Sequence, residues 1–292
     1  MRDRRQRGAV YVEFLLVFPP LLLLFLCTLQ LALLYVAHLG VQHAAAMATR
    51  SAIVVIPDDP VYYDGADKNA FSDPSNCGES PMAKVIELAG ALGKSSATIP
   101  LDTCPDGPRG APIRAAALLA MLPYSPSITR FFPNAERWAG GDVSGMIGAA
   151  LYNMAAVAVT YPTKPGATTY RPTLPRFHPG DDITVRVTYA AHCGIPIARF
   201  LLCDRPVSLV TGVDRDLRRR EDPFEIARVQ RRLKDSKPRV KELREGTMVP
   251  ALLAVLLFSD ERFRLIAAES TLPLQTAPFA YQSELAPRGG RP

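Results

Sequence analysis

The feature that most constrains this chain is an uncharged apolar run from Phe14 to Ala37. Its 24 residues would measure about 36 Å as a helix, which is long enough to cross a lipid bilayer. A cleaved secretory signal fits less well, because the apolar region of such a signal is shorter and ends in a small-x-small site. Four arginines precede Gly8 and favour a cytoplasmic amino end, so the rest of the chain is expected to lie across the membrane.

The helical pattern continues beyond this run to about residue 56. It predicts one long helix over residues 9–56 with an alanine-rich face, formed by Val41, Ala44, Ala45, Ala48 and Ala52. Small residues on such a face let another helix approach closely. Pro19 and Pro20 cost helix hydrogen bonds and are expected to kink the helix, and the two prolines within residues 57–60 are expected to end it.

The remaining chain, residues 57–285, is expected to form a small α+β domain with short helices and an antiparallel sheet. The pattern predicts helices at 81–92, 112–122 and 142–158 and strands at 182–189 and 262–274. Apolar stretches at 195–202 and 249–258 are too short to span a membrane and are interpreted as buried elements or membrane-surface contacts. The mixed-charge block 214–245 predicts a solvated helical insertion that starts at Asp222-Pro223, and residues 286–292 predict a disordered tail.

The formal net charge of +6 has local sources, namely the arginines before Gly8 and a cluster at 215–244. A face for nucleic acid is therefore not predicted, and no nucleic-acid partner is expected. The hydrophobic fraction of 48% is ordinary for a globular protein, which excludes a polytopic membrane protein.

Four of the five cysteines lie beyond the apolar run, and only Cys27 lies inside it. An even number of cysteines in an oxidising compartment permits disulfides. Three pairings are possible, and we favour nearest neighbours, Cys77 with Cys104 and Cys193 with Cys203, because each pair closes a modest loop. Buried free thiols are the alternative.

No motif predicts catalysis or metal binding. The four histidines have no ligand-like spacing, and the chain has no GxSxG, HExxH, phosphate-binding glycine loop or CxxC. His192-Cys193 is interpreted as a structural cysteine beside a surface histidine, and Asp181-Asp182 as a turn, with a Ca²⁺ ligand role as the weaker alternative. We therefore expect a protein that is not an enzyme and that needs no metal or cofactor.

Glu13, at the start of the apolar run, is the charged residue that most needs an explanation. An ionised carboxylate near the start of a membrane helix is costly and usually has a functional partner. One interpretation is an interfacial glutamate that reaches the lipid headgroups. In the other, the basic segment that ends at Gly8 is removed, and Glu13 pairs with the N-terminal amine that its removal frees on a neighbouring subunit. This pairing neutralises two charges in a low-dielectric setting.

Residues 7–14 resemble the processing site of type IV prepilins, especially that of TadE-like pseudopilins of tight-adherence (Flp-type) pilus systems. This segment reads Arg7-Gly8-Ala9-Val10-Tyr11-Val12-Glu13-Phe14. The resemblance implies that a prepilin peptidase cuts between Gly8 and Ala9. Residues 1–8 would then be a basic leader, and Glu13 would be the fifth residue of the mature chain. The resemblance covers about residues 4–55, with a weaker similarity at 268–275, and residues 57–262 inherit little from it. Larger TadG-like relatives are an alternative that no adhesion-type metal motif supports.

The resemblance implies a TadE-like minor pilin or pseudopilin that acts in pilus assembly through helix packing, with the alanine-rich face docking into a pilus base or initiation complex. It would be a single-pass protein of the bacterial inner membrane with a cytoplasmic amino end and a periplasmic domain, and it would either enter the fibre or only prime its assembly. Expected partners are the prepilin peptidase, other pilins, the inner-membrane assembly platform and the lipid bilayer, with Glu13 and Phe14 as subunit contacts. The alternatives are an uncleaved, signal-anchored periplasmic scaffold of an envelope secretion complex and, more distantly, a tethered hydrolase.

Overall fold

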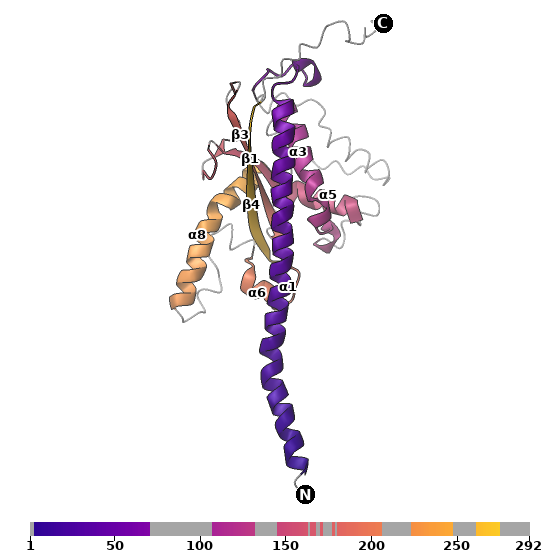
Figure 1. Ribbon diagram of the computed structural model, residues 1–292, viewed down its shortest axis with the longest axis vertical. Coiled ribbons are helices and arrows are strands. Elements are labelled where there is room, and N and C mark those ends of the chain that lie inside the picture. Colours follow the sequence, from indigo (N-terminus) through magenta and orange to yellow (C-terminus); the bar gives the residue numbers. More distant parts are fainter. Residues whose placement is uncertain are drawn as a thin grey trace.

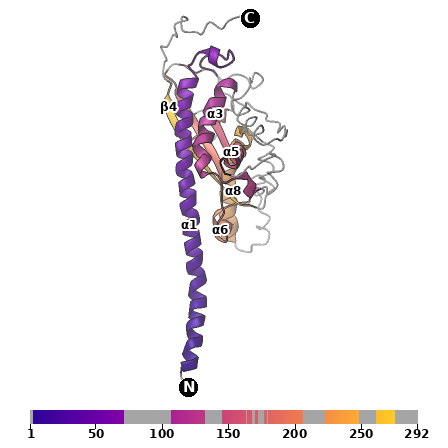
Figure 2. The ribbon, with the colours of Figure 1, turned by 90° about the vertical axis from the view of Figure 1, so that its right-hand side faces the viewer.

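A single helix, α1 (Asp3–Val55), runs through the computed structural model and carries a small α+β domain along its C-terminal half (Figure 1, Figure 2). The structure describes residues 3–70, 107–131, 145–162, 164–167, 170–171, 177–178, 180–205, 223–247 and 261–274. The predicted fold class is confirmed: a long N-terminal apolar helix precedes a domain of short helices and an antiparallel sheet.

The helix α1 begins earlier than predicted, at Asp3 instead of residue 9, and ends at Val55. Pro19 and Pro20 lie inside it, and the helix continues through both, so the kink stays a prediction. Beyond its end, the side chain of Asp59 accepts a hydrogen bond from the Val61 N–H at 3.2 Å and caps the short helix η1 (Pro60–Tyr62).

The domain is built on an antiparallel sheet with the strand order β2-β1-β3-β4. Its strands are β1 (Val157–Pro162), β2 (Tyr170–Arg171), β3 (Asp182–His192) and β4 (Phe263–Pro273). The two strands that the sequence predicts, at 182–189 and 262–274, correspond to β3 and β4. These strands pair along their whole length, from Asp182 opposite Pro273 to His192 opposite Phe263, and they form the centre and one edge of the sheet.

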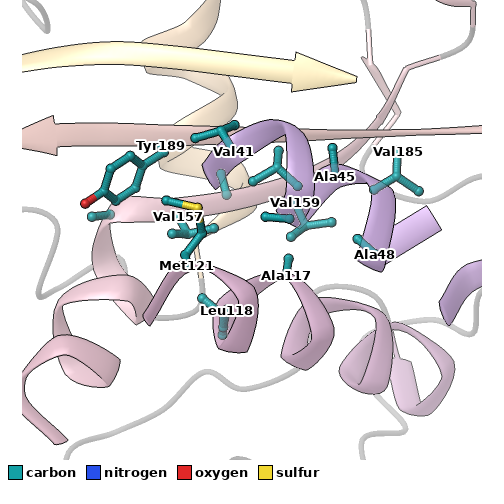
Figure 3. Close-up of a cluster of buried hydrophobic side chains, with 14 of the residues drawn as sticks. Val41, Ala45, Ala48, Ala117, Leu118, Met121, Val157, Val159, Val185 and Tyr189 are labelled. Carbon is teal, nitrogen blue, oxygen red and sulfur yellow. The ribbon is translucent and has the colours of Figure 1, made fainter. Parts of the chain in front are cut away.

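One face of the sheet packs against α1 and α3 (Gly107–Met121). Side chains from the two helices and from alternate strand positions interlock there, as Figure 3 shows. The figure labels ten members of this buried hydrophobic cluster: Val41, Ala45, Ala48, Ala117, Leu118, Met121, Val157, Val159, Val185 and Tyr189. Because the α1 contribution is mostly alanine, the backbone of α1 lies close to the sheet.

The opposite face of the sheet is partly covered by α8 (Pro223–Gly246), which starts at the predicted position. A Cβ atom on Gly246 would lie 2.9 Å from the Ala158 Cβ, so the end of this helix approaches β1 very closely. Glu242 and Leu243 are only 2% and 3% exposed. The expectation of a solvated insertion is therefore wrong for the last turns of α8, because they pack against the polar face of the sheet.

Two element boundaries also differ from the predictions. The helix predicted at 142–158 is α5 (Gly145–Ala156), and β1 follows it directly from Val157. The β-branched residues Val157, Val159 and Thr160 pair with β3, a long-range contact that helical periodicity cannot detect. The helix predicted at 112–122 begins earlier, at Gly107. The helix predicted at 81–92, the apolar stretch 249–258 and the tail 286–292 lie outside the described residues.

Candidate functional site

The N-terminal half of α1 presents an extended apolar surface. Its exposed large apolar side chains, from Tyr11 to Val36, are between 42% (Leu29) and 72% (Leu16) exposed. Among the described side chains ahead of Ala37, only Gln30 is buried. By length and composition, the stretch Glu13–Val55 is able to cross a membrane. A bilayer would cover the apolar surface that the domain leaves open.

Glu13 lies at the start of this surface and is exposed. It makes no hydrogen bond or ion pair with any other described residue. The next residue, Phe14, stacks on Phe18 with ring centroids 5.0 Å apart. Gly8 and Ala9 belong to the helical backbone, so the peptide bond between them lies within α1 and not ahead of it. A partner for Glu13 therefore has to come from outside the described part of the chain.

The alanine-rich face of α1 is buried inside its own domain. On this face Thr49 donates hydrogen bonds to the carbonyl oxygens of Ala45, at 2.7 Å, and of Ser270 on β4, at 3.2 Å. The expectation that this face docks onto another protein is therefore wrong, because the small side chains serve close packing within the chain. The residues of the face, none of which has exposed surface, are Val41, Ala44, Ala45, Ala48 and Ala52.

The other side of the same helical segment stays open. Leu39, Met47 and Val54 are 45%, 37% and 62% exposed, and His43 and Arg50 are also exposed. We call these five residues the free face of α1. They mix apolar and basic side chains, which suits a contact with another chain better than a purely solvated surface.

The C-terminal end of α1 is closed by Arg109 of α3, which has no exposed surface. Its guanidinium donates to the carbonyl oxygens of Val55 (2.6 Å), Ile56 (3.3 Å), Asp58 (3.1 Å) and Ala66 (2.8 Å). Burial lowers the pKa of Arg109, and the negative ends of the carbonyl dipoles compensate its charge. This arginine therefore joins the helix end to the domain and is not a catalytic group.

A second buried arginine, Arg186 of β3, connects the sheet to α8. Its Nε donates to Glu269 of β4 at 2.7 Å, and its Nη1 donates to Glu242 of α8. Thr188 donates to the other oxygen of Glu242 at 3.1 Å. Arg186, Glu242 and Glu269 are 8%, 2% and 25% exposed, and a hollow of about 410 Å³ adjoins them. Since both carboxylates are paired with one guanidinium, the group holds α8 in place and is poorly suited to acid–base catalysis.

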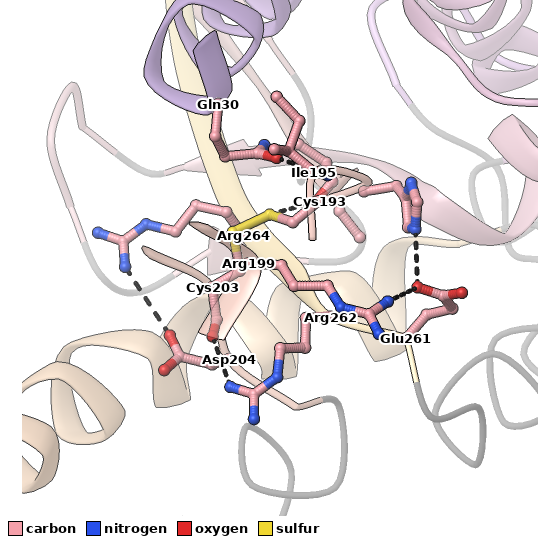
Figure 4. Close-up of a disulfide and its surroundings, with 12 residues drawn as sticks. Gln30, Cys193, Ile195, Arg199, Cys203, Asp204, Glu261, Arg262 and Arg264 are labelled. Carbon is pink, nitrogen blue, oxygen red and sulfur yellow. Dashed lines mark hydrogen bonds and ion pairs between the residues drawn. A yellow bond between two sulfur atoms is a disulfide. The ribbon is translucent and has the colours of Figure 1, made fainter. Parts of the chain in front are cut away.

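The structure contains the predicted disulfide between Cys193 and Cys203, with a sulfur–sulfur distance of 1.95 Å. It closes a loop that includes the short helix α6 (Ala198–Leu202) and lies beside α1 (Figure 4). Within this loop, the Ile195 N–H donates to the Oε1 of Gln30 at 3.1 Å. Gln30 belongs to the apolar run, so the domain contacts α1 inside the segment that is apolar enough to span a membrane.

The loop turns several apolar side chains outward. Ile197, Phe200 and Leu201 are 48%, 52% and 53% exposed, whereas Ala198 is buried. Ile197 has φ 67° and ψ −58°, and the Ala198 N–H donates to the Pro196 carbonyl at 2.8 Å, which defines a strained γ-turn. The interpretation of residues 195–202 as a buried element is therefore wrong.

His192 precedes this loop, and its side chain is buried, contrary to the expectation of a surface histidine. Its side chain is 5% exposed, and its ring lies edge-on to Phe131 with centroids 5.0 Å apart. Its Nε2 lies 3.1 Å from the Oε2 of Glu261. Burial lowers the pKa of His192 and outweighs the opposite effect of the Glu261 hydrogen bond, so the ring is neutral at pH 7. Cys193 beside it is oxidised and offers no thiolate.

The other predicted cysteine pair, Cys77 and Cys104, lies outside the described residues. Cys27 is a free thiol on α1. Within the described ranges, no group of three or more His, Cys, Asp or Glu side chains is arranged to hold a metal ion.

Sequence reasoning missed three residues that organise the structure. Gln30 had a detectable signal, since it is an amide inside an apolar run. Arg186 had a weaker one, as a charge on an otherwise regular strand. Arg109 had none, because its carbonyl partners lie 43 to 54 positions away in the sequence.

Comparison with known families places the N-terminal segment. Residues 8–50 match the family model described as TadE-like protein. The match confirms the resemblance over this segment, which contains Gly8, Glu13 and the whole apolar run. None of the curated proteins and none of the solved structures matches the chain. The match suggests involvement in tight-adherence pilus systems alongside other pilus components, and together with the apolar helix it suggests a membrane-anchored protein.

Proposed function

We propose that this protein is a TadE-like minor pilin, or pseudopilin, that acts in the assembly of a tight-adherence pilus and has no enzymatic activity of its own. The observation that carries the proposal is the two-part helix within the matched segment 8–50. Its first half is apolar and exposed, and its second half forms part of the core of the domain. Because the membrane anchor continues as one helix into the core of the domain, the way the anchor packs against its neighbours sets the position of the domain.

The proposed topology follows from the charges around α1. The basic leader, residues 1–8, would stay in the cytoplasm, α1 would cross the inner membrane, and residues 57–285 would lie in the periplasm. A disulfide between Cys193 and Cys203 supports this orientation, because disulfides persist in oxidising compartments.

Glu13 is the proposed contact with neighbouring subunits. It would pair with the Ala9 ammonium group that leader removal creates on an adjacent pilin, so that two charges are neutralised inside the membrane. Its lack of a partner among the described residues supports this role. Phe14, stacked on Phe18, would supply the adjacent apolar contact.

The free face of α1 is the proposed second contact. It replaces the alanine-rich face, which the domain already covers. Helices that pack through Glu13 in the membrane would meet again through Leu39, Met47 and Val54 above it. Contacts at two levels along one helix would fix both the register and the rotation of a subunit.

Leader removal is proposed to require local unwinding of α1. The Gly8–Ala9 bond lies in helical backbone, whereas a peptidase needs access to an unwound chain. Glycine lowers helix stability by about 1 kcal/mol relative to alanine, which makes Gly8 a favourable point for this unwinding. Pro19 and Pro20 remain the proposed kink, which would let the leader bend relative to the rest of the span.

Mass spectrometry of the protein from its native host tests the processing step. We expect the mature chain to begin at Ala9, and the Gly8→Val variant to keep residues 1–8. If residues 1–8 are retained in the wild-type protein while pili still assemble, the uncleaved periplasmic scaffold becomes the better description.

The role of Glu13 is tested with two variants. Glu13→Gln keeps the size and removes the charge, and Glu13→Ala removes both. We expect both proteins to insert into the membrane at wild-type levels and to fail in pilus assembly. Asp64→Asn is the matched control, because it removes an exposed carboxylate from the loop beyond α1. Normal pili with both Glu13 variants would exclude this residue from the mechanism.

A further inference from the structure

We propose that the disulfide-closed loop Cys193–Cys203 is a membrane-interface anchor that seats the domain on the bilayer that α1 crosses. Its apolar side chains would enter the outer surface of the membrane, and the arginines around it would contact lipid phosphates. The inference rests on α1 spanning the membrane, but it does not depend on leader cleavage. We call residues 193–203 the interfacial loop.

The position of Gln30 places the interfacial loop at the membrane boundary. Gln30 follows Glu13 by 17 residues, which corresponds to about 26 Å along the helix axis. A bilayer has a hydrocarbon core of about 30 Å, so a helix that enters it at Glu13 brings Gln30 close to the opposite edge. The hydrogen bond from the Ile195 N–H to Gln30 therefore holds the loop at this edge.

The loop directs its apolar side chains outward at this depth. Ile197, Phe200 and Leu201 are about half exposed, and all three belong to the segment that the disulfide holds together. The γ-turn at Ile197 puts a β-branched residue at a positive φ, a conformation that such residues rarely adopt. A loop that keeps a large apolar side chain outward in a strained conformation suits burial in an apolar medium better than exposure to water.

The charges around the loop complement a lipid surface. The segments 193–205 and 261–264 contain four arginines and two carboxylates, which leaves an excess of positive charge. Arg199 pairs with Glu261 at 3.1 Å, and Arg264 lies 3.8 Å from Asp204, so both carboxylates are already engaged. The guanidinium of Arg262 lies 4.5 Å from the centre of the Phe200 ring. A basic group therefore lies beside the Phe200 ring. This arrangement is expected where a ring enters the membrane at the level of the lipid headgroups.

The surface next to the loop is continuous with the apolar run. A groove of about 420 Å³ lies between α1, α6, α8 and β4. Leu31, Leu34, Leu201 and Leu202 line its apolar side, and Arg231, Asp235 and Arg264 line its charged side, where the arginines outnumber the carboxylate. An acyl chain along the leucines with its phosphate at the arginines matches this distribution. We therefore commit to a phospholipid of the outer surface as the occupant, and not to a second protein.

Depth-dependent fluorescence quenching in the full-length protein tests the inference. The chain has one tryptophan, Trp138, so a Trp138→Phe background gives single-tryptophan probes. Phe200→Trp reports on the interfacial loop, and Val61→Trp, at a site 82% exposed beyond the end of α1, is the matched control. Phe25→Trp, near the middle of the apolar run, reports whether α1 crosses the bilayer. The proteins are reconstituted in phosphatidylcholine–phosphatidylglycerol vesicles with or without bromine high on the acyl chains.

We expect brominated lipid to reduce the Phe200→Trp emission by at least half and to leave the Val61→Trp emission unchanged. Leu201→Trp is a second probe of the same loop, used if the Phe200 variant does not fold. Equal emission with and without bromine at the loop position overturns the inference. A second lipid, with bromine near the bilayer centre, tests Phe25→Trp. If this lipid quenches Phe25→Trp while the loop position is not quenched, the spanning helix and the proposed function stand and only the membrane contact of the interfacial loop is overturned. If Phe25→Trp is not quenched either, the spanning helix is lost too.

A second comparison separates headgroup contact from contact with another protein. In vesicles of phosphatidylcholine alone, we expect weaker quenching of Phe200→Trp than in vesicles with phosphatidylglycerol, because a zwitterionic surface has no net negative charge to attract the arginines. Equal quenching in both lipids overturns the role of the arginines. A loop that is quenched in neither lipid, but is protected from water-soluble quencher when a pilus protein is added, would identify a protein-docking surface in its place.

Discussion

The two halves of α1 are one continuous helix with two different surroundings. Before Ala37 the helix carries large apolar side chains that are exposed around its circumference, such as Leu16 and Leu24 at 72% and 66%. After Ala37 it carries small side chains on one face, and that face is completely buried. Bulky residues enlarge the contact with lipid, whereas alanines let a sheet and a second helix approach the backbone. The difference shows that side-chain size along one helix distinguishes the half that the domain leaves open from the half that it covers.

Gln30 is the point where the domain contacts the apolar half of the helix. It is a buried amide inside the apolar half, and it accepts a hydrogen bond from the domain. The domain therefore reaches past its own half of the helix and contacts the other. Changes that affect one half only are the sharpest tests of this division.

The largest expected effect comes from Arg109, at the far end of the buried half. Arg109→Met would remove the guanidinium that binds four carbonyl oxygens, of which that of Ile56 keeps a second donor outside the helix, the Asn69 N–H, and this should lower the free energy of unfolding by about 3 kcal/mol. Arg50→Met, on the free face of the same helix, should change it by less than about 0.5 kcal/mol. Denaturant unfolding in detergent, followed by near-ultraviolet circular dichroism, measures both. Equal stabilities would contradict the proposed role of Arg109 in joining the helix end to the domain.

Alkaline pH should act on the buried half through Tyr189. Burial raises the pKa of Tyr189 to about 12, against the ordinary value of 10.0. The neutral phenol is therefore favoured in the folded state, and this contribution is complete below pH 10 and is lost as the pH rises through 12. The loss should amount to roughly 2 to 3 kcal/mol of unfolding free energy. Unfolding experiments from pH 9 to pH 12 compare the wild type with Tyr189→Phe. The unfolding free energy should fall more steeply with pH in the wild type, and identical pH profiles would contradict this role of Tyr189.

Ala48 and Ala32 form a matched pair across the two halves. Ala48→Leu adds bulk where the helix meets the sheet, and overpacking of this kind should cost about 2 kcal/mol. Ala32→Leu adds the same bulk on the exposed apolar half and should leave the domain unchanged. The midpoint of thermal unfolding in detergent reports both effects. A domain that tolerates leucine at both positions would remove the distinction between the halves.

The smallest expected effect is at Gln30, where the domain contacts the apolar half. Gln30→Leu should leave the Ile195 N–H without its acceptor and cost about 1 kcal/mol, with no loss of membrane insertion. Gln42→Leu is the control, because Gln42 is exposed and bonds only to the His38 side chain among the described residues. Hydrogen exchange at Ile195 should quicken in the first variant alone. Unchanged exchange would show that the contact does not hold the loop.

Local patterns predicted much of the fold, and the failures have a common cause. The alternation over 182–189 identified β3 because successive side chains of a strand point to opposite faces of the sheet, although both faces of β3 are buried. The helix predicted at 142–158 extends wrongly into β1 because a short apolar run has no unique period, and pairing with β3 decides the conformation of this segment. His192 and Glu242 were both expected in solvent. Each is buried by an aromatic or charged partner from a remote segment, Phe131 and Arg186 respectively.

The candidate site divides in the same way. Gly8, Glu13 and the apolar run form one short segment whose meaning is local, and the family match confirms the resemblance that the sequence showed there. The interfacial loop required the tertiary structure, because only the folded chain places Ile195 beside Gln30, 165 positions away in the sequence.

By itself, the sequence determined that a long helix contains an apolar run starting next to Glu13 and that a domain with antiparallel strands follows. These properties depend on the length of the apolar run and on the spacing of apolar residues, both of which are visible in a short local segment of the sequence. Tertiary structure alone decided which face of α1 is buried, which arginine closes its end and where the domain meets the apolar run. Those outcomes depend on burial, and burial is set by whatever distant segment covers a residue.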